Sequence, residues 1–160
     1  VRSRPGQGTS VDLYLPVRAT TTAVRESPAA ADELAGEETI LVAEDDPGVR
    51  QLTCQLLANS GYRVLTARDG REALAVFAEH AADVDLALLD VVMPGGGGRE
   101  VHDAIRRTAP DLPILFCTGY DLDVVHPGFT PGAATGVLQK PFGGRELLRQ
   151  VRTLLPPAAP

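Results

Sequence analysis

The sequence predicts an α/β fold, a doubly wound parallel sheet of five strands, on three observations. Short apolar segments alternate with segments of helical period over residues 39–155. The run LALL at 86–89 is apolar at every position, which is typical of a strand that helices cover on both faces of a parallel sheet. Asp90 follows that run directly, and ligands of such sheets bind beyond the carboxyl ends of the strands.

Each element has its own pattern. The predicted strands are residues 39–44, 62–67, 84–90, 112–118 and 136–139. The predicted helices are residues 46–61, 70–80, 98–110 and 143–155, and the first of these places Leu52, Leu56 and Leu57 on one face. A further helix is expected between the last two strands, but residues 126–136 carry two prolines and three glycines. We therefore expect at most one helical turn at 121–125, so that this helix is short or missing.

Length and charge limit the classes of function. At 160 residues the chain suits one domain with a core, and it is too short for two ordinary domains. A net charge of −6 and the absence of basic runs argue against a nucleic-acid partner and against contact with an anionic membrane. No apolar run reaches the roughly 20 residues of a membrane helix, and the first residues lack the apolar core of a signal peptide, so we expect a cytoplasmic location. Cys54 and Cys117 have neither metal-ligand nor disulfide spacing and are interpreted as packing residues.

Polar residues follow four of the predicted strands. They are Glu44, Asp45 and Asp46 after the first strand, Asp90 at the end of the third, Thr118 at the end of the fourth and Lys140 after the fifth. Because the carboxyl ends of parallel strands lie along one edge, the carboxylates of the first and third strands would repel one another unless a cation joined them. Mg²⁺ is a hard ion that accepts carboxylate, water and phosphate oxygens. The pattern therefore indicates a site for a metal ion and a phosphate group.

Some of these residues also have simpler interpretations. Lys140 is the only lysine beside fourteen arginines, and its compact charge suits a single phosphoryl oxygen, although chance could equally leave one lysine on the surface. Asp46 precedes Pro47 and is interpreted as a helix cap rather than as a metal ligand. The glycines at 95–98 lack the spacing of a nucleotide-binding motif and are interpreted as a flexible loop. The three histidines are assigned no role.

Four short motifs resemble those of the receiver domains of bacterial two-component response regulators. They are AEDDP at 43–47, LLDVVMP at 88–94, CTGY at 117–120 and QKPF at 139–142. Each motif is weak alone, but all four occur in the family's order and on the ends of predicted strands. The resemblance covers residues 39–155 and implies a flavodoxin-like sheet with the strand order 2-1-3-4-5.

The resemblance implies a role for each residue of the motifs. The phosphorylated nucleophile would be Asp90. The implied ligands of Mg²⁺ are Asp45, Asp90, Glu44 through a water molecule, and the backbone carbonyl of Val92. The groups implied to contact phosphoryl oxygens are Thr118 and Lys140, and Gly119 would leave room for the phosphate. The chain would then be a phosphoacceptor with at most self-phosphorylation and self-dephosphorylation activity, and its partner would be a histidine kinase or a histidine phosphotransfer domain.

Two features depart from the usual receiver pattern. Many receivers carry an aromatic residue three positions before the lysine, where this chain has Val137. Residues 126–136 alter the helix through which many receivers dimerise or contact an output domain. The succession of TGY, H-x-G, PG and KPF resembles receivers attached to the C-terminus of hybrid histidine kinases.

The residues before the receiver motifs also resemble part of a histidine kinase. Val11, Leu13 and Leu15 alternate with polar positions and predict a strand. The segment PGQGTSVDLYLP at 5–16 resembles the last glycine box and final strand of the ATP-binding domain of histidine kinases. The predicted division is a kinase fragment, a linker, a receiver domain and a tail, at residues 1–16, 17–38, 39–156 and 157–160. Residues 1–38 are expected to contribute little to the receiver core.

The leading hypothesis is a receiver domain that is phosphorylated on Asp90 with Mg²⁺, as the C-terminal part of a hybrid sensor histidine kinase. The alternative is a phosphate-independent interaction module with a receiver fold. Five residues that occur together argue against it, namely Glu44, Asp45, Asp90, Thr118 and Lys140. A third hypothesis is a phosphohydrolase with an aspartate nucleophile. That chemistry usually needs a second acid two residues after the nucleophile, where this chain has Val92.

Overall fold

A computed structural model describes residues 1–4, 6, 8–12, 14, 34–119, 132 and 134–156. The strands of its larger sheet are β3 (Thr39–Ala43), β4 (Arg63–Ala67), β5 (Leu86–Asp90), β6 (Ile114–Thr118) and β7 (Thr135–Gln139). The helices are α2 (Pro47–Asn59), α3 (Gly70–His80), α4 (Gly98–Thr108) and α6 (Gly144–Leu154). Within these ranges, none of the helices combines the length and the apolar character needed to cross a membrane.

The five strands are parallel and lie in the order β4-β3-β5-β6-β7. Counted within this sheet the order is 2-1-3-4-5, so the predicted fold class and topology are confirmed. β7 begins at Thr135, one residue earlier than predicted. The prediction of a short or missing helix falls on residues 121–136, and most of these lie outside the described residues.

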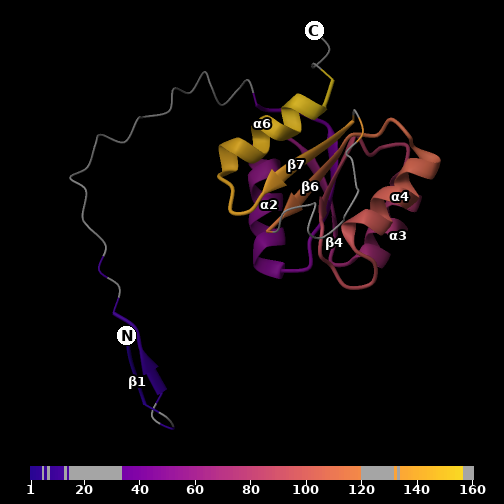
Figure 1. Ribbon diagram of the computed structural model, residues 1–160. Helices are drawn as coiled ribbons and strands as arrows, with labels where there is room; N and C mark the ends of the chain where they lie inside the picture. Colours follow the sequence, from indigo (N-terminus) through magenta and orange to yellow (C-terminus); the bar gives the residue numbers. More distant parts are fainter. Residues whose placement is uncertain are drawn as a thin grey trace.

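Helices cover both faces of the sheet, with α2 and α6 on one side and α3 and α4 on the other (Figure 1). Alternate residues of each central strand point to opposite faces. The core on the α3/α4 side includes Leu41, Ala43, Leu89 and Phe116, and the core on the α2/α6 side includes Ile40, Val42, Leu88 and Leu115. Every residue of β3, β5 and β6 is buried, which explains why these strands are apolar at consecutive positions.

The N-terminal segment differs from its prediction. It forms a hairpin of β1 (Arg2–Arg4) and β2 (Gly8–Ser10), in which Arg2 pairs with Ser10. Of the predicted strand, residues 11, 12 and 14 belong to no strand, so the prediction is wrong at these positions, and Leu13 and Leu15 lie outside the described residues. The physical reason is the turn, because Gly6 and Gly8 adopt positive φ angles of 74° and 82° and fold the chain back before the alternating residues begin.

Residues 34–38, which belong to the predicted linker, make specific contacts with the receiver. The Tyr62 hydroxyl donates a hydrogen bond to the carbonyl of Leu34 at 3.0 Å, and the backbone N–H of Gly36 donates to Ser60 at 3.0 Å. The guanidinium of Arg152, near the end of α6, donates two hydrogen bonds to the carboxylate of Glu38. The folded unit therefore includes residues 34–38, which are hydrogen-bonded to α6 and to residues just before β4.

The ion pair between Glu38 and Arg152 predicts a pH-dependent part of the stability. Hydrogen bonding from Arg152 lowers the pKa of Glu38, and partial burial offsets only some of this effect. Glu38→Gln is expected to lower the free energy of unfolding by about 1 to 2 kcal/mol at pH 7, because charge-assisted hydrogen bonds are lost. A carboxyl whose pKa is lowered by folding stabilises the fold above its ordinary pKa of about 4.3 and ceases to do so as the pH falls through the folded value.

Urea unfolding of the wild type and Glu38→Gln at pH 7 and at decreasing pH measures this contribution. The difference between the two proteins should shrink below about pH 4. Glu37→Gln is the matched control, since Glu37 is an exposed neighbour in the same segment, and it should change little at either pH. Equal stability of the wild type and Glu38→Gln at pH 7 would contradict the prediction.

Candidate functional site

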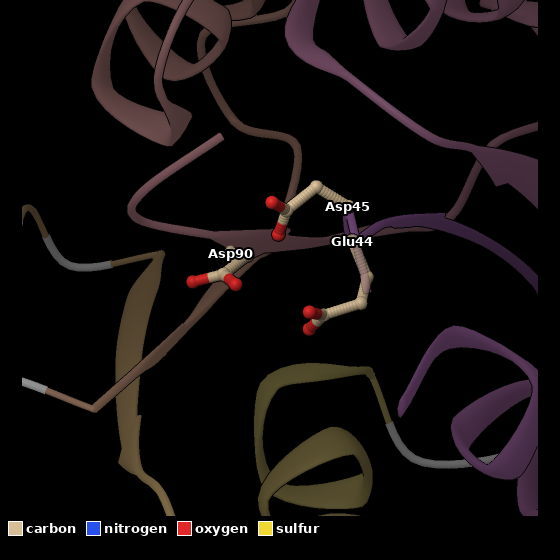
Figure 2. Close-up of side chains that lie close together, drawn as sticks. All are labelled: Glu44, Asp45 and Asp90. Atoms are coloured by element: carbon tan, nitrogen blue, oxygen red, sulfur yellow. The ribbon is translucent and has the colours of Figure 1, made fainter. Parts of the chain in front are cut away.

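Three carboxylates meet at the carboxyl edge of the sheet. Glu44 and Asp45 follow β3, and Asp90 is the last residue of the neighbouring β5. One carboxylate oxygen of each lies within 4.8 Å of the others, and Figure 2 shows the three groups converging from the two strand ends. Glu44 is 3 % exposed and Asp90 is 8 % exposed, whereas Asp45 is open to solvent. The predicted convergence of these three residues is therefore present in the structure.

Lys140 joins two of the carboxylates from the end of the edge strand β7. It follows β7, and its Nζ donates to Oε2 of Glu44 at 2.7 Å and to Oδ2 of Asp90 at 2.9 Å. Its backbone N–H donates to the carbonyl of Thr118 at 2.7 Å, which ties the lysine to the end of β6. Burial lowers the pKa of Lys140, but the hydrogen bonds to Glu44 and Asp90 outweigh it and leave that pKa raised, so the lysine is firmly cationic.

The carboxylates and the lysine do not balance in charge. Three carboxylates face one ammonium, so the ionised cluster carries an excess of negative charge. Burial raises the pKa of Glu44, the hydrogen bond from Lys140 opposes that rise, and the charge of Asp90 adds to it. A hard cation bound to the carboxylate oxygens would relieve this repulsion. The donor set therefore fits Mg²⁺, whereas burial raises the pKa of the neighbouring Cys117 thiol to about 12 and disfavours a thiolate ligand.

The remaining predicted residues lie around the same edge. Thr118 ends β6 and is 2 % exposed. At Gly119 an added Cβ would meet no atom of the described residues within 4 Å. Val92 is exposed, and its backbone N–H donates a long hydrogen bond of 3.4 Å to Oδ1 of Asp90. These positions agree with the expected arrangement around a phosphate, although their roles stay predictions.

Asp46 is the member of the acidic run that turns away from the site. Its Oδ1 accepts hydrogen bonds from the backbone N–H groups of Gly48 at 2.8 Å and Val49 at 2.9 Å. It is the N-cap of α2, and Pro47 follows in the first helical turn. The interpretation of Asp46 as a helix cap is confirmed.

The glycine loop at 95–98 packs more tightly than its composition suggests. A Cβ added at Gly98 would lie 2.4 Å from the carbonyl oxygen of Asp90, and one added at Gly70 would lie 1.9 Å from the carbonyl oxygen of Gly96. Gly95 and Gly96 also have positive φ angles, of 71° and 111°. The glycines therefore allow the loop after Asp90 to pass against the backbone of β5 and of the turn before α3.

Sequence reasoning missed Arg50 at this site. The Nη1 of Arg50, in the first turn of α2, donates to the backbone carbonyl of Glu44 at 2.6 Å and to that of Asp45 at 3.2 Å. The one sequence feature that could have drawn attention to Arg50 is its place near the N-terminal end of a predicted helix, where the helix dipole disfavours a cation. Nothing in the sequence alone shows which oxygens such a residue would reach.

The family of the chain follows from comparison with known proteins. The model of the response regulator receiver domain matches residues 40–152. The sensor kinase CckA of Brucella abortus is 33 % identical over 161 residues, an alignment that covers 96 % of this chain and 17 % of that protein. The response regulator MprA of Mycolicibacterium vanbaalenii is 41 % identical over 116 residues, which are 72 % of this chain and 49 % of that protein.

Solved structures agree with this assignment. The receiver domain of the hybrid histidine kinase CckA has a TM-score of 0.64 at 33 % identity, over 74 % of this chain and 99 % of that one. The response regulator TrrA of Thermotoga maritima, solved in complex with Mg(2+)-BeF, has a TM-score of 0.65 at 36 % identity, with the same coverage. This chain spans about a sixth of the curated sensor kinase and about half of the MprA regulator. Through residues 40–152 the chain belongs to the family of response regulator receiver domains of two-component systems.

Proposed function

We propose that this receiver accepts a phosphoryl group on Asp90 in a Mg²⁺-dependent reaction. The observation that carries the proposal is the meeting of Glu44, Asp45 and Asp90 within 4.8 Å, with Lys140 bound to two of them. Phosphoryl transfer depends mainly on positioning and on neutralising the charge of the transferred group. The strand positions the carboxylate of Asp90. Lys140 and a metal ion bound by the acidic residues would neutralise the charge.

In the proposed reaction, a carboxylate oxygen of Asp90 attacks the phosphorus of a phosphorylated histidine. The new O–P bond forms as the N–P bond breaks, and the electron pair of that bond returns to the imidazole nitrogen. The ammonium of Lys140 stabilises one phosphoryl oxygen and the hydroxyl of Thr118 hydrogen-bonds another. Asp90 is held in place because it ends a buried strand that pairs with β3 on one side and with β6 on the other, where Asp90 itself lies opposite Cys117.

The residues that would hold Mg²⁺ are Asp45 and Asp90 directly, Glu44 through water, and the backbone carbonyl of Val92. When bound, the ion supplies a double positive charge that draws the carboxylates and the phosphoryl oxygens together. The solved complex of TrrA with Mg(2+)-BeF supports this part of the proposal, since that protein shares the receiver fold.

We further propose that the chain is the C-terminal part of a hybrid histidine kinase in the cytoplasm. The alignment with the sensor kinase covers 96 % of this chain, so it takes in most of residues 1–38, whereas the alignment with MprA covers 72 %. The partner would be the histidine of a kinase or of a histidine phosphotransfer domain, rather than a nucleic acid or a membrane. The coding sequence upstream of Val1 tests this, because it should encode a histidine-bearing helical pair and an ATP-binding domain.

The alternative function is a phosphate-independent interaction module, and a labelling experiment separates the two. The chain is incubated with a small-molecule phosphodonor and Mg²⁺, and its intact mass is measured. The proposal expects the gain of one phosphoryl group, and much less gain in excess chelator. No gain with Mg²⁺, or an equal gain with chelator, would favour the alternative.

A further inference from the structure

We propose that Arg50 is a positioning residue that holds the two acidic side chains after β3 in their metal-binding arrangement. The inference rests on the proposed Mg²⁺ site and adds to it a residue outside the set of ligands and phosphate contacts. Arg50 lies on α2, one turn after the loop that joins β3 to this helix. It would act through the main chain of Glu44 and Asp45.

The contacts of Arg50 are directed at the backbone of the acidic pair. Nη1 donates to the carbonyl oxygen of Glu44 at 2.6 Å and to that of Asp45 at 3.2 Å. A bond from a guanidinium to a carbonyl is charge-assisted and therefore stronger than a bond between neutral groups. The peptide groups that follow Glu44 and Asp45 are thus both hydrogen-bonded to the side chain of Arg50.

The place of Arg50 in the helix needs a local explanation. The first turn of α2 contains no acidic residue, and the N-terminal end of a helix is unfavourable for a cation. This unfavourable effect is opposed by the hydrogen bonds that Arg50 donates to the carbonyl groups of Glu44 and Asp45. The position of Arg50 therefore stabilises the loop between β3 and α2 rather than the helix itself.

Lys140 and Arg50 contact different parts of the acidic residues. Lys140 binds the carboxylate oxygens of Glu44 and Asp90, which are the atoms that a metal or a phosphoryl group would also use. The hydrogen bonds of Arg50 to the acidic pair go to main-chain oxygens and leave the carboxylates available to a metal ion. Arg50 can consequently hold the loop both before and after an ion binds.

Asp46 secures the same loop from its other end. Its side chain caps the N–H groups of Gly48 and Val49, and its carbonyl accepts a bond from the backbone N–H of Arg50 at 2.9 Å. The cap fixes the start of the helix, and the arginine fixes the end of the strand relative to it. Side chains beyond the first ligand shell that orient a metal site in this way typically affect metal affinity.

Calorimetric titration with Mg²⁺ alone tests the proposal on the whole chain. Arg50→Met keeps much of the length of the side chain and removes its hydrogen bonds, and we expect it to weaken the apparent Kd for Mg²⁺ by about tenfold or more. If Arg50 acted only through its charge, the same variant would bind Mg²⁺ more tightly, because one cation near the dication would be gone. The direction of the change therefore separates positioning from simple charge.

Two further variants complete the test. Arg50→Lys keeps the charge and one donor group, and we expect a Kd between those of the wild type and Arg50→Met. Arg63→Met is the matched control, because Arg63 is exposed at the start of β4, at the opposite end of the strand from the site, and it should leave the Kd unchanged. If Arg50→Met fails to fold in thermal unfolding measured in parallel, Arg50→Lys decides.

An unchanged or tighter Kd in Arg50→Met, or in Arg50→Lys where that variant decides, would overturn the role of Arg50. This result is independent of phosphorylation, since the titration contains no phosphodonor. If the wild type binds Mg²⁺ but gains no phosphoryl group, the proposed function fails while the role of Arg50 stands. If the wild type binds no Mg²⁺, both proposals fail.

Discussion

Asp90→Asn is expected to abolish the gain of a phosphoryl group from a small-molecule phosphodonor in the presence of Mg²⁺. The substitution keeps the size of the side chain but replaces a charged oxygen nucleophile by an amide, which is a very poor nucleophile. It also removes one of the negative charges that would bind the metal ion. Intact mass measured over time should show one added phosphoryl group on the wild type and none on the variant.

The exposed residue Asp83 provides a control for that experiment. Asp83→Asn changes the net charge by the same amount on the same protein, and it lies in the loop before β5. This variant should be labelled at the wild-type rate. Labelling of Asp90→Asn at the wild-type rate would show that another residue accepts the phosphoryl group and would contradict the assignment.

The sheet and the site could be predicted from sequence for the same physical reason. Strands that helices cover on both faces are apolar throughout, so a carboxylate such as Asp90 at the end of such a run is conspicuous. Parallel strands place their carboxyl ends on one edge, and this rule brings Glu44, Asp90 and Lys140 together although the last two are 50 residues apart. Both inferences depend on patterns that are local in the sequence.

The features that sequence reasoning missed depend on contacts between distant parts of the chain and on backbone conformation. The sequence predicts a flexible loop around the glycine at 98, and only the structure shows that its Cα lies too close to the carbonyl of Asp90 for a side chain. The contacts of residues 34–38 with Arg152 and Tyr62 join positions that are far apart in the chain. The hairpin at the N-terminus depends on glycine φ angles, which a pattern of apolar residues does not reveal.

Lys140→Met should destabilise the fold when Mg²⁺ is removed by a chelator, and Mg²⁺ should restore much of the loss. Lys140 is 24 % exposed at its side chain, and its partners Glu44 and Asp90 are 4 % and 12 % exposed at theirs. Removing the ammonium leaves two nearly buried carboxylates facing each other, at a cost of about 1 to 3 kcal/mol in the free energy of unfolding. A bound divalent cation stabilises the native state and can replace the missing positive charge.

Urea unfolding of the wild type and Lys140→Met, each with chelator and with Mg²⁺, measures the effect. The gain in stability from Mg²⁺ should be larger in Lys140→Met than in the wild type, because the variant begins with the greater unrelieved repulsion. Arg149→Met on the exposed side of α6 is the control, and it should respond to Mg²⁺ as the wild type does. Equal stability of Lys140→Met and the wild type in chelator would mean that the lysine does not hold the carboxylates together, and the charge argument for the metal site would lose its basis.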